Sequence, residues 1–100
     1  MSRSVQDVAK MLQQIMAEKF GGKTDTRFKI SRERLAQLAG RKILHTSYLS
    51  DLSDACIEGG LLFINLDNFF AVQELDVVER YRSVPPYIVS KLIAATSSIE

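Results

Sequence analysis

The spacing of apolar residues changes twice between residues 27 and 73, and this change limits the fold to a mixture of helices and strands. Residues 27–30 alternate apolar and basic side chains, which is the period of a half-buried strand. Residues 31–39 and 44–58 repeat apolar side chains every three or four positions, as one face of a helix does. Residues 61–73 hold two short apolar runs separated by a polar pair. The order strand, helix, helix, hairpin predicts an α+β fold.

Capping and turn residues stand at the expected boundaries of these elements. Ser31 is a suitable N-cap for the first helix of the pair, and Gly40 can supply the left-handed residue that closes it. In the hairpin, Asp67 and Asn68 both tolerate a positive φ. The inward face of the second helix is predicted to consist of Leu44, Tyr48, Leu49, Leu52, Ala55, Cys56 and Ile57.

Two further helices are predicted outside this region. Residues 4–20 carry apolar side chains at helical spacing, with Ser4 as a candidate N-cap and a following glycine pair as the stop. Residues 75–84 are compatible with either a helix or an extended chain. Residues 86–97, which begin with a proline, have the apolar stripe of a last amphipathic helix.

The succession of elements in residues 27–73 resembles the winged helix-turn-helix of nucleic-acid-binding proteins. The resemblance covers about half of the chain and depends on the order and spacing of the elements. It implies a winged-helix fold of helix, short strand, helix, helix and two-stranded wing, here with an extra C-terminal helix. In such proteins the second helix of the motif reads bases in the major groove, while the preceding turn and helix contact phosphates.

Carried onto this chain, the resemblance implies a set of DNA-binding residues. The helix that starts near Leu44 would read duplex DNA with His45, Thr46, Ser47 and Ser50. Phosphates would be held by Arg32, Arg34, Arg41 and Lys42.

The resemblance also implies a homodimer, because terminal helices commonly dimerise in prokaryotic-type regulators that are similar to this layout. A two-fold dimer would place two recognition helices about one DNA turn apart. The alternative is that the helices of residues 4–20 and 86–97 both pack on the core of their own monomer.

Charge is distributed unevenly along the chain, although the formal net charge is only +1. Residues 23–45 contain seven basic side chains and two acidic ones, whereas residues 51–80 contain seven acidic side chains and one basic one. The basic segment suits a polyanion, and the acidic segment suits a basic protein surface. The alternative is that both segments are simply solvated faces.

Composition and the absence of catalytic patterns argue against a membrane protein, a metalloprotein and an enzyme. A chain of 100 residues with 46% hydrophobic and 25% charged side chains is typical of one soluble globular domain, and we expect a cytoplasmic location with no membrane partner. The single cysteine, Cys56, lies on an inward helix face and is expected in the core. His45, the single histidine, has no grouped partners for a metal or a catalytic triad. We therefore expect no enzyme activity, metal or cofactor.

Two hypotheses remain. The first is a small DNA-binding protein, a transcriptional or replicon-associated regulator that binds duplex DNA through the basic segment. The second is a winged-helix protein–protein interaction module of a larger complex, which uses the acidic face of residues 51–80. The predicted hairpin tip favours the second, because Leu66, Asp67 and Asn68 include no basic residue for a DNA groove.

Overall fold

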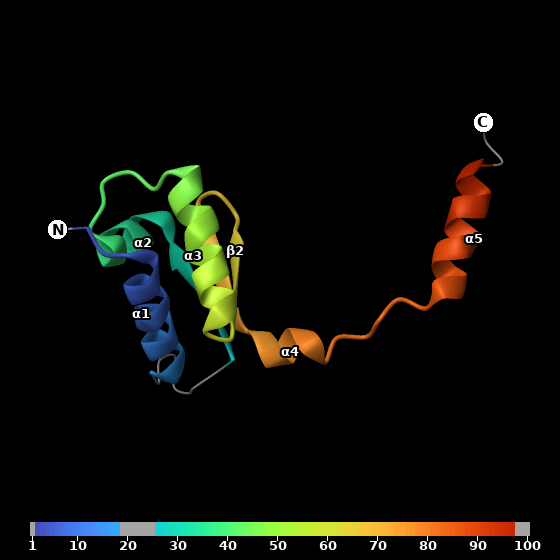
Figure 1. Cartoon of the computed structure of the whole chain (residues 1–100), viewed down its shortest axis with the longest axis horizontal. Coiled ribbons are helices and arrows are strands. Elements are labelled where there is room, and N and C mark those ends of the chain that lie inside the picture. Colours follow the sequence, from blue (N-terminus) through green and yellow to red (C-terminus); the bar gives the residue numbers. More distant parts are fainter. Residues whose placement is uncertain (1, 19–25, 98–100) are drawn as a thin grey trace.

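The computed structural model describes residues 2–18 and 26–97, and in this part of the chain it contains five helices and one three-stranded antiparallel sheet (Figure 1). The predicted α+β class is therefore confirmed. The elements in chain order are α1 (Val5–Ala17), β1 (Arg27–Ser31), α2 (Arg32–Ala39), α3 (Thr46–Glu58), β2 (Leu61–Asn65), β3 (Phe69–Glu74), α4 (Leu75–Glu79) and α5 (Pro86–Ser97).

The first helix, α1, begins where its capping residue predicts and ends earlier than expected. The Oγ atom of Ser4 accepts a hydrogen bond from the backbone N–H of Asp7, which satisfies one free donor of the first turn. The helix ends at Ala17, and Glu18 already has an extended backbone. The predicted end at residue 20 is thus wrong, and the glycine pair assigned as the stop lies outside the described residues.

Helix α2 and the turn after it are fixed by local backbone chemistry. The Oγ atom of Ser31 accepts from the backbone N–H of Arg34, as the sequence predicts. At the other end Gly40 has a φ of 67°, a left-handed conformation that costs a glycine little. The backbone N–H groups of Gly40 and Arg41 donate back to the carbonyls of Gln37 and Ala36, which closes the helix and redirects the chain.

Helix α3 packs between α1 and β2, and its inward face carries most of the predicted core residues. It begins at Thr46, two residues after the predicted start, because His45 is the extended N-cap. Leu49, Leu52 and Cys56 are buried, whereas Ile57 remains 45% exposed. The assignment of Ile57 to the inward face is therefore wrong, since it lies one position beyond the edge of the buried stripe.

The sheet has the strand order β1-β3-β2, with the first and last strands both antiparallel to the central one. The β2–β3 hairpin is as predicted, and Asp67 takes the positive φ, at 70°. The Oδ1 atom of Asn65 accepts a hydrogen bond from the backbone N–H of Asp67 and holds this turn.

Alternation along the strands gives the sheet two unlike faces. On the face toward the helices, Phe63 and Phe70 are buried and their rings stack with centroids 5.0 Å apart. The other face, which we call the open face, carries Ile64 and Phe69, and these side chains are 39% and 38% exposed. Helices α1, α2 and α3 therefore form one layer on one side of the sheet.

The C-terminal part of the chain extends away from this core. Residues 75–84, predicted as either helix or extended chain, divide between a short helix, α4 (Leu75–Glu79), and a non-helical segment, residues 80–84. Every side chain of residues 86–96 in α5 is exposed, and Figure 1 shows this helix standing apart at the end of an extended segment. The radius of gyration is 17.6 Å, compared with about 13 Å for a compact domain of this length. Of the two terminal helices, α1 packs on the core of its own chain and α5 does not.

Cys56 provides a test of this core through the pH dependence of stability. Its side chain is buried, and desolvation raises the pKa of the thiol to about 11, above the value of roughly 8.5 in an unfolded chain. Between these two values the unfolded chain loses a proton that the folded chain retains, so the free energy of unfolding should fall as pH rises. The expected slope reaches up to about 1.4 kcal/mol per pH unit.

The measurement is urea denaturation from pH 8 to 11, with Cys56→Ala as the control. The variant should lack the contribution of this thiol and show a smaller loss of stability over the same range. Equal slopes for the two proteins would contradict a buried, protonated Cys56.

Candidate nucleic-acid interface

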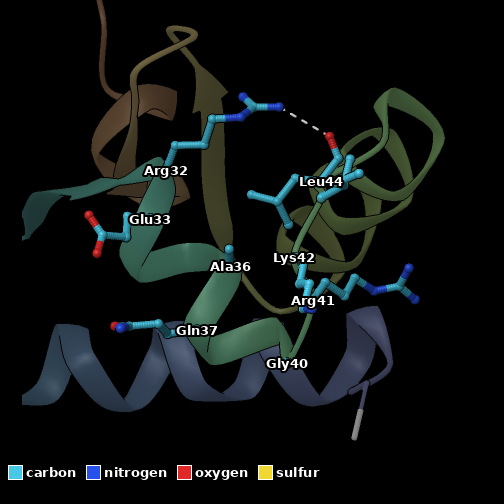
Figure 2. A pocket seen from close by; sticks show the side chains of 9 residues that line it. Arg32, Glu33, Ala36, Gln37, Gly40, Arg41, Lys42 and Leu44 are labelled. Atoms are coloured by element: carbon cyan, nitrogen blue, oxygen red, sulfur yellow. Dashed lines mark hydrogen bonds between the residues drawn. The ribbon is translucent and has the colours of Figure 1, made fainter.

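An open hollow of about 760 Å³ lies between α2 and the loop that leads to α3 (Figure 2). It contains three of the four predicted phosphate ligands together with one acidic residue. Its lining consists of Arg32, Glu33, Ala36, Gln37, Gly40, Arg41, Lys42, Ile43 and Leu44. The hollow borders the start of α3, so the loop cations and the predicted base-reading residues belong to one region of the surface.

Arg32 connects three segments of the chain through its guanidinium group. Nη2 donates to the carbonyl of Leu44 at 3.1 Å, as Figure 2 shows, and Nη1 donates to the carbonyl of Asp67 at 3.0 Å. The same group lies 5.7 Å from the centroid of the Phe70 ring. Arg32 therefore joins the start of α2 to the loop before α3 and to the tip of the β2–β3 hairpin. A role of this kind is structural, and the sequence prediction did not foresee it.

Arg41 is also held within the chain. Its Cζ atom lies 3.9 Å from the centroid of the Tyr48 ring, and its Nε atom is buried with no hydrogen-bond partner. Burial raises the pKa of the Tyr48 hydroxyl, while the positive charge of Arg41 acts in the opposite direction. The Tyr48 hydroxyl donates to the carbonyl of Arg3 at 3.0 Å. The loop is thus anchored to α3 by a stacked cation.

Lys42 is the exposed cation of this loop, and the first turn of α3 follows it closely. The side chains of His45, Thr46, Ser47 and Ser50 are all exposed. The N-cap residue makes no side-chain hydrogen bond to the helix, and the first turn contains no acidic residue. Helices α1 and α2 both have a serine cap and an acidic first turn. The positive end of the α3 dipole is therefore open to an anion from outside.

The remaining basic residues lie elsewhere, so the basic segment does not form one surface. Arg34 lines a different hollow, between α1, β1 and α2, together with Arg3 and Ile30, and its Nη1 atom donates to Gln37 Oε1 at 3.0 Å. Lys29 is on the open face of the sheet, with Nζ 5.6 Å from the Phe69 ring centroid. The structure groups Arg32, Arg41 and Lys42 with the start of α3 and separates Arg34 from them.

The acidic segment is divided as well. Asp51 and Asp54 are exposed on α3 and continue the stripe that begins with Ser47 and Ser50, because residues three and four apart share a helix face. Glu74 and Asp76 instead line a hollow at the other end of α3, beside Gly59. The predicted acidic face of residues 51–80 thus consists of at least two separate surfaces.

The described residues contain no group of three or more His, Cys, Asp or Glu side chains placed to hold a metal ion. In the same part of the chain, no helix has the length and apolar character that crossing a membrane requires. Comparison with known proteins gives no match to any family model, curated protein or solved structure. The fold and the site therefore rest on the structure alone.

Replacing Arg32 tests whether it connects the loop and the hairpin. Arg32→Met removes two hydrogen bonds and a ring contact while keeping much of the aliphatic volume, and it should lower the free energy of unfolding by about 1–2 kcal/mol. The matched control is Arg34→Met, an exposed position two residues away, which should change stability by less than about 0.5 kcal/mol. Equal effects in chemical denaturation would mean that Arg32 is an ordinary surface residue.

Proposed function

We propose that this chain is a small DNA-binding protein of the winged helix-turn-helix class, a transcriptional or replicon-associated regulator that acts as a homodimer and not as an enzyme. The observation that carries the proposal is the exposed N-terminal half of α3 beside Lys42, within an element order and a β1-β3-β2 sheet that suit this class. Helix α2 and the loop after it would lie along the backbone of the duplex. The β2–β3 hairpin would be the wing.

The phosphate contacts follow from the positions of the cations and of the open helix end. Lys42 is free to approach a phosphate, and the backbone N–H groups of the first turn of α3 point in the direction that an anion needs. Arg41 supports this loop by stacking on the Tyr48 ring, and its positive charge lies in the same hollow as Lys42. Arg32 acts in this proposal as a positioning residue, because its guanidinium donates to two carbonyls of the chain.

Base contacts are assigned to Thr46, Ser47 and Ser50. These side chains are short, uncharged and exposed on the first two turns of α3. Short hydroxyl side chains let a helix approach base edges closely, and each can donate or accept a hydrogen bond. His45 precedes them at the N-cap and would contact either a base or the sugar–phosphate backbone.

The test is the binding of the full chain to mixed-sequence duplex DNA in a mobility-shift assay at low salt, followed by selection from a random duplex library. Lys42→Ala should weaken binding to every duplex to a similar extent and should reduce the salt slope by about one. The control is Lys10→Ala, an exposed lysine of α1, which should leave the affinity and the slope unchanged. If no duplex binds even at low salt, the proposal fails.

Ser47→Ala in the same assay separates base contacts from phosphate contacts. This variant should change the preferred sequence while retaining most of the non-specific affinity, because a base contact distinguishes among sequences and a phosphate contact does not.

A second candidate function is a protein interaction made by the acidic part of α3, and the placement of three carboxylates favours it. Asp51, Asp54 and Glu58 occupy the exposed side of α3 below the proposed base contacts, and Ile57 is exposed among them. A basic partner surface with an apolar centre would complement this stripe. The tip of the hairpin, with Leu66 and Asp67 exposed, adds no positive charge that would favour DNA.

The double variant Asp51→Asn with Asp54→Asn distinguishes the two functions. If α3 enters a DNA groove, removing two carboxylates near phosphates should tighten duplex binding by about 3-fold to 10-fold at low salt. If α3 binds a basic protein, the same variant should lose that partner in a pull-down, whereas Lys42→Ala should retain it. Unchanged DNA affinity together with loss of a partner would favour the protein interaction.

A further inference from the structure

Helix α5 buries none of the side chains of residues 86–96 against the part of the chain that the structure describes. Its largest apolar side chains, Tyr87, Leu92 and Ile93, are 71%, 61% and 61% exposed. Lys91 is its single charged side chain among the described residues. A helix of 12 residues without tertiary contacts is only marginally stable in water. In isolated helices shorter than about 12–15 residues, the hydrogen bonds formed barely offset the loss of chain entropy. This helix requires a covering surface.

The open face of the sheet presents a matching apolar surface. Ile64 pairs with Ala71 across β2 and β3, and Phe69 follows on the same face, so these side chains form a continuous stripe. Leu66, in the turn beside them, is 47% exposed. Polar groups border this stripe: Lys29 on the edge strand β1 lies with Nζ 5.6 Å from the Phe69 ring centroid, and Gln73 on the central strand β3 is on the same face. One face of this sheet is thus covered by helices, and the other carries a solvated apolar stripe bordered by polar side chains, whereas a helix layer commonly covers an apolar stripe of this kind.

We propose that α5 of one copy packs on the open face of the sheet of a second copy, and that the exchange is reciprocal, so that two copies form a closed two-fold dimer. The occupant of the open face is therefore α5 of an identical chain. The inference rests on the homodimer of the proposed function but not on its DNA partner. It assigns the dimer contact to the side of the sheet opposite α1, α2 and α3.

The dimensions of the two surfaces agree. The 12 residues of α5 span about 18 Å at a rise of 1.5 Å per residue. Strands β2 and β3 have 5 and 6 residues, which span about 17–20 Å at roughly 3.3 Å per residue. The helix therefore covers the stripe along its whole length without projecting far beyond it.

The apolar area is comparable with that of a small dimer interface. One side of α5 carries Ile88, Val89, Leu92 and Ile93. With roughly 100 Å² for each fully exposed large side chain, burying the exposed parts of these residues and of Ile64, Leu66 and Phe69 removes at most about 650 Å² of apolar area in the two symmetric contacts. Because interfaces are about 57% apolar, the total area is on the order of 1,100 Å². A specific interface needs about 1,000 Å² or more.

The connection between α4 and α5 favours exchange over folding back onto the same sheet. The hydroxyl of Tyr81 donates to Oε1 of Gln73 at 3.0 Å, which holds the start of the connection against β3. Val84 and Pro85 each precede a proline, and this position restricts the backbone to extended conformations. The connection therefore leads α5 away from its own core, as in Figure 1, and an extended arm of this kind is typical of exchanged dimers.

The first experiment measures the mass of the full chain by light scattering over about 1–100 µM, without DNA. The wild-type chain should show twice the monomer mass of 11.2 kDa. Leu92→Asp and Ile64→Asp should each raise the dissociation constant of the dimer at least about 100-fold, because each buries two unpaired carboxylates per dimer. Ile43→Asp, at an exposed isoleucine of the α2–α3 loop, should change it less than about 3-fold. A monomeric wild-type chain overturns the proposal.

The second experiment identifies the surface that α5 occupies. Chains carrying Ile64→Cys are mixed with differently tagged chains carrying Leu92→Cys or Val89→Cys and then oxidised, and a chain carrying both Ile64→Cys and Leu92→Cys is oxidised in a separate sample. The native Cys56 thiol is buried and protonated at neutral pH, so it should contribute little. A disulfide between the two kinds of chain is the expected result.

Two other results would contradict the exchange. A disulfide formed only within a single chain that carries both new cysteines would mean that α5 folds back onto its own sheet. A disulfide formed only between two Leu92→Cys chains would mean that α5 pairs with α5. Because neither experiment contains DNA, failure here leaves the Lys42 test of DNA binding intact.

Discussion

The burial of the inner side of α3 is the constraint on which the rest of the structure depends. Leu49, Leu52 and Cys56 occupy the space between α1 and the sheet, and this contact fixes both neighbours at once. A helix that buries one side necessarily exposes the opposite side, and on α3 that side begins with small hydroxyl residues and continues with carboxylates. The hydrophobic core therefore determines which polar side chains are available for binding, although none of them belongs to it.

Arg32 is a charged residue that the sequence assigns to phosphate binding but that the structure uses to connect segments of the chain. Its guanidinium replaces lost water contacts with two carbonyl oxygens, from the loop before α3 and from the hairpin tip. The proposed wing and the proposed recognition helix are thereby held by one side chain. Lys42, ten residues later, makes no such contact and keeps its charge free for a partner. Two cations of the same sequence segment thus have different uses.

Sequence alone predicts the parts of this fold that local chemistry determines. Ser31 caps its helix with a donor three residues away, and Gly40 adopts the left-handed conformation of a helix end, so both depend only on neighbours. The partners of Arg32 lie 12 and 35 residues away, and no spacing rule identifies them. Ile57 fits the helical period but lies beyond the edge of the buried stripe. Arg34 and Lys42 belong to the same basic segment, yet they line different hollows. Arg34 is on α2 in the hollow shared with α1 and β1, whereas Lys42 is in the loop after α2.

The proposed dimer contact and the proposed DNA contact are compatible because they use different layers of the molecule. The open face lies on one side of the sheet, and α3 packs on the other side with its N-terminal half directed outward. An exchanged α5 would add a third layer without covering Lys42 or Ser47. A dimer that binds DNA through both α3 helices would need to hold them about one DNA turn, roughly 34 Å, apart. Exchange of α5 would join two copies while leaving the outer side of each α3 helix exposed.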